Sequence, residues 1–234
     1  MNKNADQEWV EREVLQGKDI LFYGTLAEDF STIPPEEFWK EFRTHLEKYL
    51  ATKTNRADLY HQLIDQKLDE LIERDKRYGY PPPYCHKGCA NCCHEIVYCT
   101  NEEAELIHDY CVKNKIEIDY AKIERQLKTV ELDEQGNHTG ITTWNDQSES
   151  EQSCIFLDPN EKVCRIWPVR PFVCRVHLAE ETDHYCRPYN GDPHPQAKGI
   201  TYPEWSYVLS AIFTIHQDTI KKTMVQLLSK LRTL

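Results

Sequence analysis

Cysteine is the residue that most limits what this chain of 234 residues can form, because eight of its ten cysteines lie in two dense groups. The first group is Cys85, Cys89, Cys92 and Cys93, and the second group is Cys154, Cys164, Cys174 and Cys186. Short separations within the first group allow several thiolates to reach one ion at little cost in loop entropy. A lone buried cysteine is usually a small core residue, but that explanation fails for two such groups. We therefore expect all eight to be metal ligands and the two groups to meet in the fold.

The two other cysteines receive different predictions. Cys111 stands within a helical pattern and is expected to be an ordinary core residue. Cys99 follows the first group but lies outside its tight spacing, so its role is left open.

The spacing of the cysteines does not choose the metal. Two closed zinc sites with four cysteines each would use all eight thiolates. One [4Fe–4S] cluster would use four and leave four for zinc or another iron centre. A site with three protein ligands and one open position would instead be catalytic in character. Zinc and iron both remain open at this point.

Basic residues surround part of the second cysteine group. Arg170 and Arg175 bracket Cys174, where they can favour the thiolate or hold an anionic cofactor or substrate. Arg165 is expected to form a surface ion pair instead. Four histidines lie near the two groups and could replace a ligand, although such residues are more often supporting partners. These are His86, His94, His177 and His184.

The overall charge bears on the partners of the chain. The formal net charge is -11, whereas a nucleic-acid-binding domain usually carries a basic surface. We therefore expect metal ions as partners, no nucleic acid, and a possible protein partner at the N-terminal helices. No apolar run resembles a signal peptide or a membrane span. A cytoplasmic location is expected, where thiols stay reduced.

Apolar spacing predicts a mainly α fold with a small irregular β-hairpin, in which a metal-stapled cysteine-rich core is surrounded by helices. Residues 1–80 are expected to form a helical extension, 81–200 the cysteine-cluster domain, and 201–234 a packing helix that forms one compact unit with the core.

Individual elements follow from the same spacing. Helices are expected near 36–50, 56–76, 101–112 and 119–130, and the hairpin across 154–167. The apolar stripes of the first two are Phe38, Trp39, Phe42, Leu46 and Leu50, then Leu59, Leu63, Leu68, Leu71 and Ile72. Thr100 and Glu103 form a capping box, and Thr201 is expected to begin one helix that continues to Leu231.

The motifs around the cysteines also carry a family resemblance. Cys-x3-Cys-x2-Cys-Cys is followed by Cys-Ile-Phe-Leu-Asp, by Cys-Arg-Ile-Trp and by Arg-Pro-Phe-Val-Cys-Arg. This order resembles the YkgJ-type cysteine cluster family, described as a zinc- or iron-chelating domain, over residues 85–186. One departure is that Trp167 stands where the family commonly has tyrosine.

The resemblance implies a protein that holds zinc or iron. The metal either stabilises the fold as a structural ion or is held for storage or delivery. Flagellin lysine methylases carry a similar cysteine cluster. The alternative is therefore an iron–sulfur or metal-dependent enzyme for redox or group-transfer chemistry, with Arg170 and Arg175 near an anionic substrate. The sequence does not decide whether the chain is an enzyme.

Overall fold

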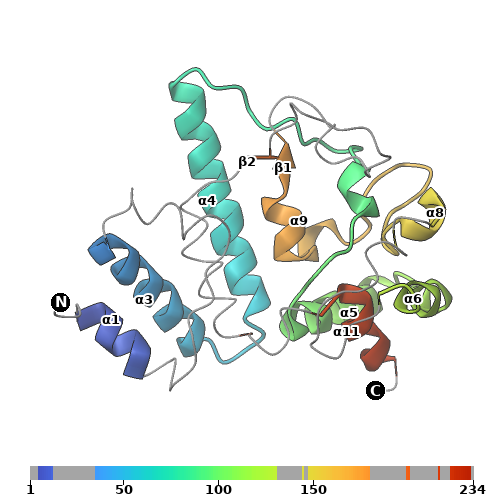
Figure 1. Cartoon of the computed structure of the whole chain (residues 1–234), viewed down its shortest axis with the longest axis horizontal. Coiled ribbons are helices and arrows are strands. Elements are labelled where there is room, and N and C mark those ends of the chain that lie inside the picture. The colour runs from blue at the N-terminus through green and yellow to red at the C-terminus, as the bar shows by residue number, and fades with distance from the viewer. Residues whose placement is uncertain are drawn as a thin grey trace. The chain divides into compact units, whose positions relative to one another are not determined.

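The computed structural model describes residues 5–12, 35–130, 147–179 and 222–232, together with Trp144, His216 and the pair 199–200. The chain divides into two compact units (Figure 1). One unit, here called the N-terminal unit, comprises Met1–Arg74 and Thr201–Lys221. The other, the cysteine unit, comprises Asp75–Ile200 and Lys222–Leu234. The predicted boundaries at 80 and 200 stay a prediction.

The described elements of the N-terminal unit are all helical. They are α1 (Ala5–Val10), α3 (Pro35–Ala51) and most of α4 (Ala57–Arg77). Proline starts α3, where its missing N–H costs nothing because that position has no partner within the helix. Helices α1 and α3 pack together, and Arg43 joins them by an ion pair of 3.0 Å to Asp6.

Helix α3 buries most of the predicted stripe. Phe38, Phe42 and Leu46 have no exposed surface, which confirms the spacing argument at these positions. Leu50 is 46% exposed, so its inclusion in the buried stripe was wrong. The helix ends one residue later, at Ala51, so Leu50 lies in its last turn.

Helix α4 forms where it was predicted, but its buried face differs from the predicted one. Tyr60, Ile64 and Leu71 are buried, whereas the predicted stripe is only partly buried apart from Leu71. The reason is aromatic packing, because Tyr60 stacks on Tyr49 with ring centroids 6.0 Å apart. Large aromatic side chains bury more area than leucine and therefore determine which face turns inward.

His45 on α3 makes the N-terminal unit sensitive to acid. Burial lowers the pKa of His45 from 6.5 to about 4, and the charges of Lys48 and Lys67 act in the same direction. Its Nδ1 atom is buried without a hydrogen-bond partner in the described part of the chain. Because the pKa of His45 is lower in the folded than in the unfolded state, the free energy of unfolding has its full value above pH 6.5. It decreases as the pH falls towards 4, because the unfolded state then binds the proton more readily.

The substitution His45→Gln is expected to flatten this pH dependence. The wild type should lose about 2–3 kcal/mol more stability than the variant between neutral pH and pH 4, since each pKa unit corresponds to about 1.4 kcal/mol. Urea denaturation at several pH values, followed by circular dichroism, measures the difference. Identical pH dependence in the two proteins would contradict the prediction.

The cysteine unit contains the shorter elements. They are η2 (Asn91–His94), α5 (Asn101–Asn114), α6 (Tyr120–Leu127), α8 (Glu149–Gln152), η3 (Trp167–Val169), α9 (Phe172–Val176), β1 (Leu178–Ala179), β2 (Gly199–Ile200) and α11 (Met224–Leu231). Helix α11 packs on both α5 and α6, as Figure 1 shows. The shared core includes Ile107, Ile123, Phe156, Ile166 and Leu228. Hydrophobic burial on this scale is the main stabilising force of such a core.

Helix α5 confirms the predicted capping box. The side chain of Thr100 accepts a hydrogen bond from the Glu103 amide at 3.1 Å, and the Glu103 carboxylate accepts one from the Thr100 amide at 2.9 Å. Both residues have no exposed surface. Two amides that no helical partner can satisfy are therefore paired inside the protein.

The predicted C-terminal helix is interrupted before Met224. Residues 201–215 and 217–221 lie outside the described residues, so the start predicted at Thr201 lies there as well. Thr223 is extended and caps α11, so a single helix reaching Leu231 was wrong. The cause is β-type pairing with the segment after the first cysteines. The amide of Cys99 donates to the Lys222 carbonyl at 3.3 Å, and that of Met224 donates to the Val97 carbonyl at 2.8 Å.

The predicted hairpin across 154–167 is small and irregular. One antiparallel bridge joins Leu157 to Cys164, and Asp158 organises the turn by accepting amides of Asn160 and Glu161, both at 2.9 Å. Strands β1 and β2 pair over two residues each. The described chain is thus mainly α-helical, as predicted. None of its described helices has the length and apolarity needed to cross a membrane.

Candidate metal centre

The two cysteine groups meet through the main chain. The amide of Cys154 donates to the carbonyl of Cys93 at 2.6 Å. This contact joins residues far apart in the sequence and confirms the expectation that the two halves come together.

Local structure positions the first group. Gly88 has a positive φ of 92°, which only glycine adopts easily, and it turns the chain between Cys85 and Cys89. Cys92 and Cys93 then lie on the short 3-10 helix η2. The indole Nε1 of Trp144 donates to the His94 carbonyl at 3.0 Å and so holds the end of this helix.

The second group is placed by the hairpin and by α9. Cys154 and Cys164 lie on its two arms, while Cys174 lies on α9. Helix α9 is anchored at its start, because the Phe172 amide donates to the buried carboxylate of Glu103 at 2.6 Å. The sequence indicated Glu103 only as a helix cap, and this second contact was missed.

Electrostatic interactions show that five of these thiols share one region. Burial raises the pKa of Cys174 well above its ordinary value, and the charges of Cys154, Cys92 and Cys164 raise it further. A hydrogen bond with Cys92 is the largest cause that raises the pKa of Cys93, followed by burial and then by charges that include Cys154 and Cys174. Such mutual effects require short separations, because screening weakens distant charge interactions.

The remaining shifts describe the same neighbourhood. Burial raises the pKa of Cys154 to about 12, and burial is also the largest cause that raises the pKa of Cys164. The hydrogen bond with Cys93 lowers the pKa of Cys92 to about 7. Thiols whose pKa is raised by burial, such as Cys154 and Cys164, stay protonated unless a nearby cation compensates the negative charge. A thiol that coordinates a metal ion loses its proton outright.

The other predicted ligands lie less centrally or outside the described residues. The sulfur of Cys85 accepts from the Ala179 amide at 3.4 Å, which places it beside β1 and the end of α9. Cys89 lines a cavity that also reaches Cys154. Cys186 lies outside the described residues.

The two cysteines outside the groups are both fully within the apolar core. Cys111 has 1% of its surface exposed, which confirms its prediction as a core residue. Cys99 has no exposed surface and belongs to the same core cluster. Burial, the largest cause, and the charges of Glu103 and Cys174 raise its pKa well above the ordinary value. Cys99 therefore packs in the core at the border of the cysteine region.

The arginines have three different environments. Arg170 lies over the ring of Trp167, with Cζ 3.4 Å from the centroid, and its charge lowers the pKa of Cys174 against the larger effect of burial. Arg175 is buried and donates to the carbonyls of Arg170 at 3.0 Å and Pro168 at 2.7 Å. A role of Arg170 or Arg175 toward an anionic ligand stays a prediction.

Arg165 differs from its prediction. Instead of a surface ion pair in the described part of the chain, its guanidinium donates to the Ile155 carbonyl at 2.7 Å. The Nε atom is buried without a hydrogen-bond partner among the described residues. Its side chain also lines the cavity that reaches Cys89 and Cys154.

The described histidines differ in their surroundings, and their role as ligands or as supporting partners stays a prediction. His94 lies 3.7 Å from the Glu149 carboxylate, and His86 contacts the Tyr84 carbonyl at 2.8 Å through Nδ1. Burial lowers the pKa of His177. His184 lies outside the described residues.

The donor set fits zinc or iron by its chemistry but not yet by its geometry. Thiolates are the ligands that structural zinc and iron–sulfur clusters prefer, and five of them share this region. However, no three Cys, His, Asp or Glu side chains in the described ranges are arranged to hold an ion as they stand. Binding would require rotation about the Cα–Cβ bonds, which moves each sulfur among its staggered positions.

Comparisons with known proteins agree with this donor chemistry. A family model, CxxCxxCC, described as "Putative zinc- or iron-chelating domain", matches residues 84–190. Neither a search of curated proteins nor a search of solved structures gave a match. The matched range includes all eight cysteines of the two groups, Cys186 among them. The match spans less than half of the chain, and it makes residues 84–190 similar to this family of metal-chelating domains.

Proposed function

We propose that the chain binds zinc or iron through the thiolates of its two cysteine groups. The observation that carries the proposal is the meeting of the groups, through the 2.6 Å hydrogen bond between the main chains of Cys93 and Cys154. The central ligands are Cys92, Cys93, Cys154, Cys164 and Cys174, and Cys85 and Cys89 are outer ligands. Cys186 is proposed as a further ligand from its place in the sequence alone. The adjacent Arg170 offsets part of the negative charge that several thiolates would bring together.

Elemental analysis of anaerobically purified protein tests the proposal. A stoichiometric amount of zinc or iron is expected, and broad absorbance near about 400 nm would identify an iron–sulfur centre. Protein that contains neither metal, and takes up neither after reduction and incubation with each ion, would contradict the proposal.

Substitutions locate the ligands. Cys92→Ser and Cys174→Ser are each expected to weaken metal binding by more than the ~10–100-fold typical for loss of an outer-shell partner, because a ligand is removed. The matched control is Cys111→Ala, since Cys111 is a core residue that belongs to neither group. Metal content per chain and competition with a coloured chelator provide the measurement. Equal metal affinity in Cys92→Ser and Cys111→Ala would exclude Cys92 as a ligand.

A second candidate function is a metal-dependent redox or group-transfer enzyme. The observation that favours it is the cavity of about 860 Å³ that reaches both Cys89 and Cys154, because a substrate needs space beside the metal. A closed site, with every coordination position filled by cysteine, would instead favour a structural metal or a role in metal storage or delivery. X-ray absorption spectroscopy of the loaded protein counts the sulfur ligands and separates the two.

The setting of this function is also part of the proposal. Eight cysteines that bind metal need a compartment that keeps thiols reduced, and the cytoplasm provides it. We further propose that the helices of the N-terminal unit bind a protein partner. Isolation of the tagged chain from cells, with and without residues 1–74, would reveal a partner that depends on this unit.

A further inference from the structure

The cavity beside the cysteines is large enough to hold a small molecule. Its volume is about 860 Å³, within the ~300–1,000 Å³ usual for ligand pockets. Its walls belong to the cysteine unit and come from the loop of the first cysteines, the start of α6, the region of α8 and the hairpin. A bare metal ion would fill only a small part of this space.

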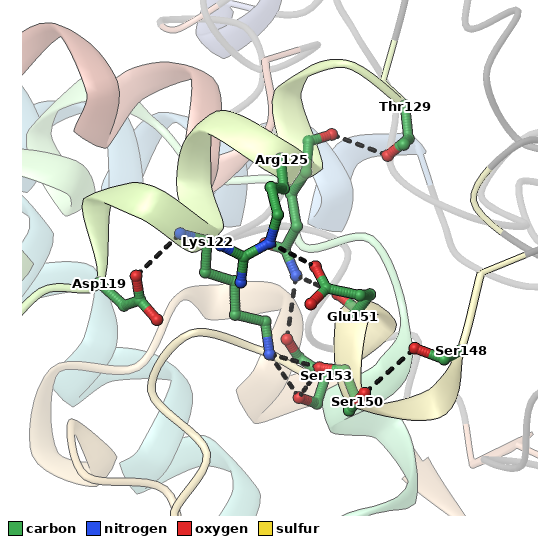
Figure 2. Close-up of polar contacts among 9 residues, drawn as sticks. Asp119, Lys122, Arg125, Thr129, Ser148, Ser150, Glu151 and Ser153 are labelled. Atoms are coloured by element: carbon green, nitrogen blue, oxygen red, sulfur yellow. Dashed lines mark hydrogen bonds and ion pairs between the residues drawn. The ribbon is translucent and has the colours of Figure 1, made fainter.

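Three cations line the cavity and retain hydrogen-bond donors. Lys122 donates two hydrogen bonds from Nζ, to the Ser150 carbonyl at 2.7 Å and to Ser153 Oγ at 2.6 Å, as Figure 2 shows. Arg165 keeps its Nε donor without a partner in the described chain. Lys162 forms no side-chain hydrogen bond or ion pair with any described residue. An ammonium group offers three donors and a guanidinium five, so several donors remain available here.

The carboxylates of the same wall are already engaged. Asp119 accepts the Lys122 amide at 2.8 Å as the cap of α6, and Asp158 accepts two amides in the hairpin turn. Glu149 lies 3.7 Å from His94. The three carboxylates balance the three cations in charge, but the Arg165 Nε donor and the Lys162 ammonium have no partner among the described residues, and a ligand with acceptor oxygens would satisfy them.

We propose that this cavity binds a small molecule carrying an oxyanion, either a carboxylate or a phosphate, through Lys162, Arg165 and Lys122. Charge-assisted hydrogen bonds of this type are short and strong, and the guanidinium plane suits such a group. The proposed site is separate from Arg170 and Arg175. It gives the cysteine unit a second ligand, and its three cations are not among the proposed metal ligands.

Lys162 provides a clean test because the chain offers a matched control. Lys162 is exposed and has a φ of 52°, so Lys162→Asn removes the charge while keeping a residue that tolerates this left-handed conformation. Lys115 is also exposed, has a φ of 56°, and does not line the cavity. Lys115→Asn therefore makes the same chemical change on the same backbone conformation at a distance from the site.

Calorimetric titration with inorganic phosphate and with succinate, at constant ionic strength, gives the readout. At least one anion should bind saturably, and Lys162→Asn should weaken it roughly tenfold, as expected for one charged hydrogen bond. Lys115→Asn should leave the affinity within about twofold. Binding of phosphate alone assigns a phosphate ligand, and binding of succinate alone assigns a carboxylate.

The proposal is overturned if neither anion binds saturably, or if the two asparagine variants bind alike. The latter result would show that Lys162 does not contact the anion. Metal content is measured on every sample. Loss of anion binding with intact metal therefore remains distinct from a failure of the metal proposal.

Discussion

Removal of the metal is expected to lower the unfolding temperature of the cysteine unit by about 10 °C or more. Structural zinc contributes about 10–16 kcal/mol in small zinc-binding peptides. Even half of that value would produce this shift, since 1 kcal/mol corresponds to about 2–4 °C in a chain of this size. The proposed ligands lie on η2, on the hairpin and on α9, so loss of the metal would free these segments from one another.

The measurement compares thermal unfolding before and after chelation under reducing conditions. Hydrogen exchange should show the loss of protection in η2 and α9, whereas α3 of the N-terminal unit should keep its protection. The variant Cys111→Ala should show the same chelation shift as the wild type. If a sample verified as metal-free unfolds at the temperature of the loaded protein, the metal is not a structural staple.

The substitution Glu103→Ala is expected to destabilise the cysteine unit by about 3–5 kcal/mol. The carboxylate accepts the amides of Thr100 at 2.9 Å and Phe172 at 2.6 Å, and Glu103 has no exposed surface. Alanine would leave both amides buried without this acceptor, at about 1–3 kcal/mol for each, and would leave a cavity as well. Since Phe172 starts the helix that carries Cys174, metal affinity should fall too.

The control for this substitution is Glu105→Ala, which removes an exposed carboxylate from the same helix. Urea denaturation should place Glu105→Ala within about 0.5 kcal/mol of the wild type. Glu103→Gln is expected to be intermediate, because the amide retains one acceptor oxygen but turns a donor toward the other amide. If Glu103→Ala were as stable as Glu105→Ala, the carboxylate would not be the link between α5 and α9.

Local signals in the sequence predicted much of the helical structure. The capping box at Thr100 and Glu103 is a pattern of neighbouring residues, so its geometry follows from the chain itself. The bond from Glu103 to Phe172 involves a distant segment, and no local pattern contains that information. The same distinction explains the C-terminal helix, where pairing of Lys222 and Met224 with Cys99 and Val97 overrides helical spacing.

For the candidate metal centre, the sequence predicted the chemistry of the ligands but not the positions of the residues around them. Cysteine spacing predicted the two groups and the need for them to meet, because metal ligands must converge. The wall that Lys122, Lys162 and Arg165 form was not predictable, since α6 and the hairpin approach each other only in the folded chain. Arg165 was expected at a surface ion pair, and its side chain instead turns to the Ile155 carbonyl.

The pairing of residues 97–99 with 222–224 also has a consequence for biosynthesis. Met224, Leu227 and Leu228 complete the core that contains Ile107, Ile123 and Phe156, although they lie well beyond the segment 84–190 that the family model matches. During translation, the metal-binding segment therefore leaves the ribosome before its own core can close. This core can therefore close only after α11 has been synthesised.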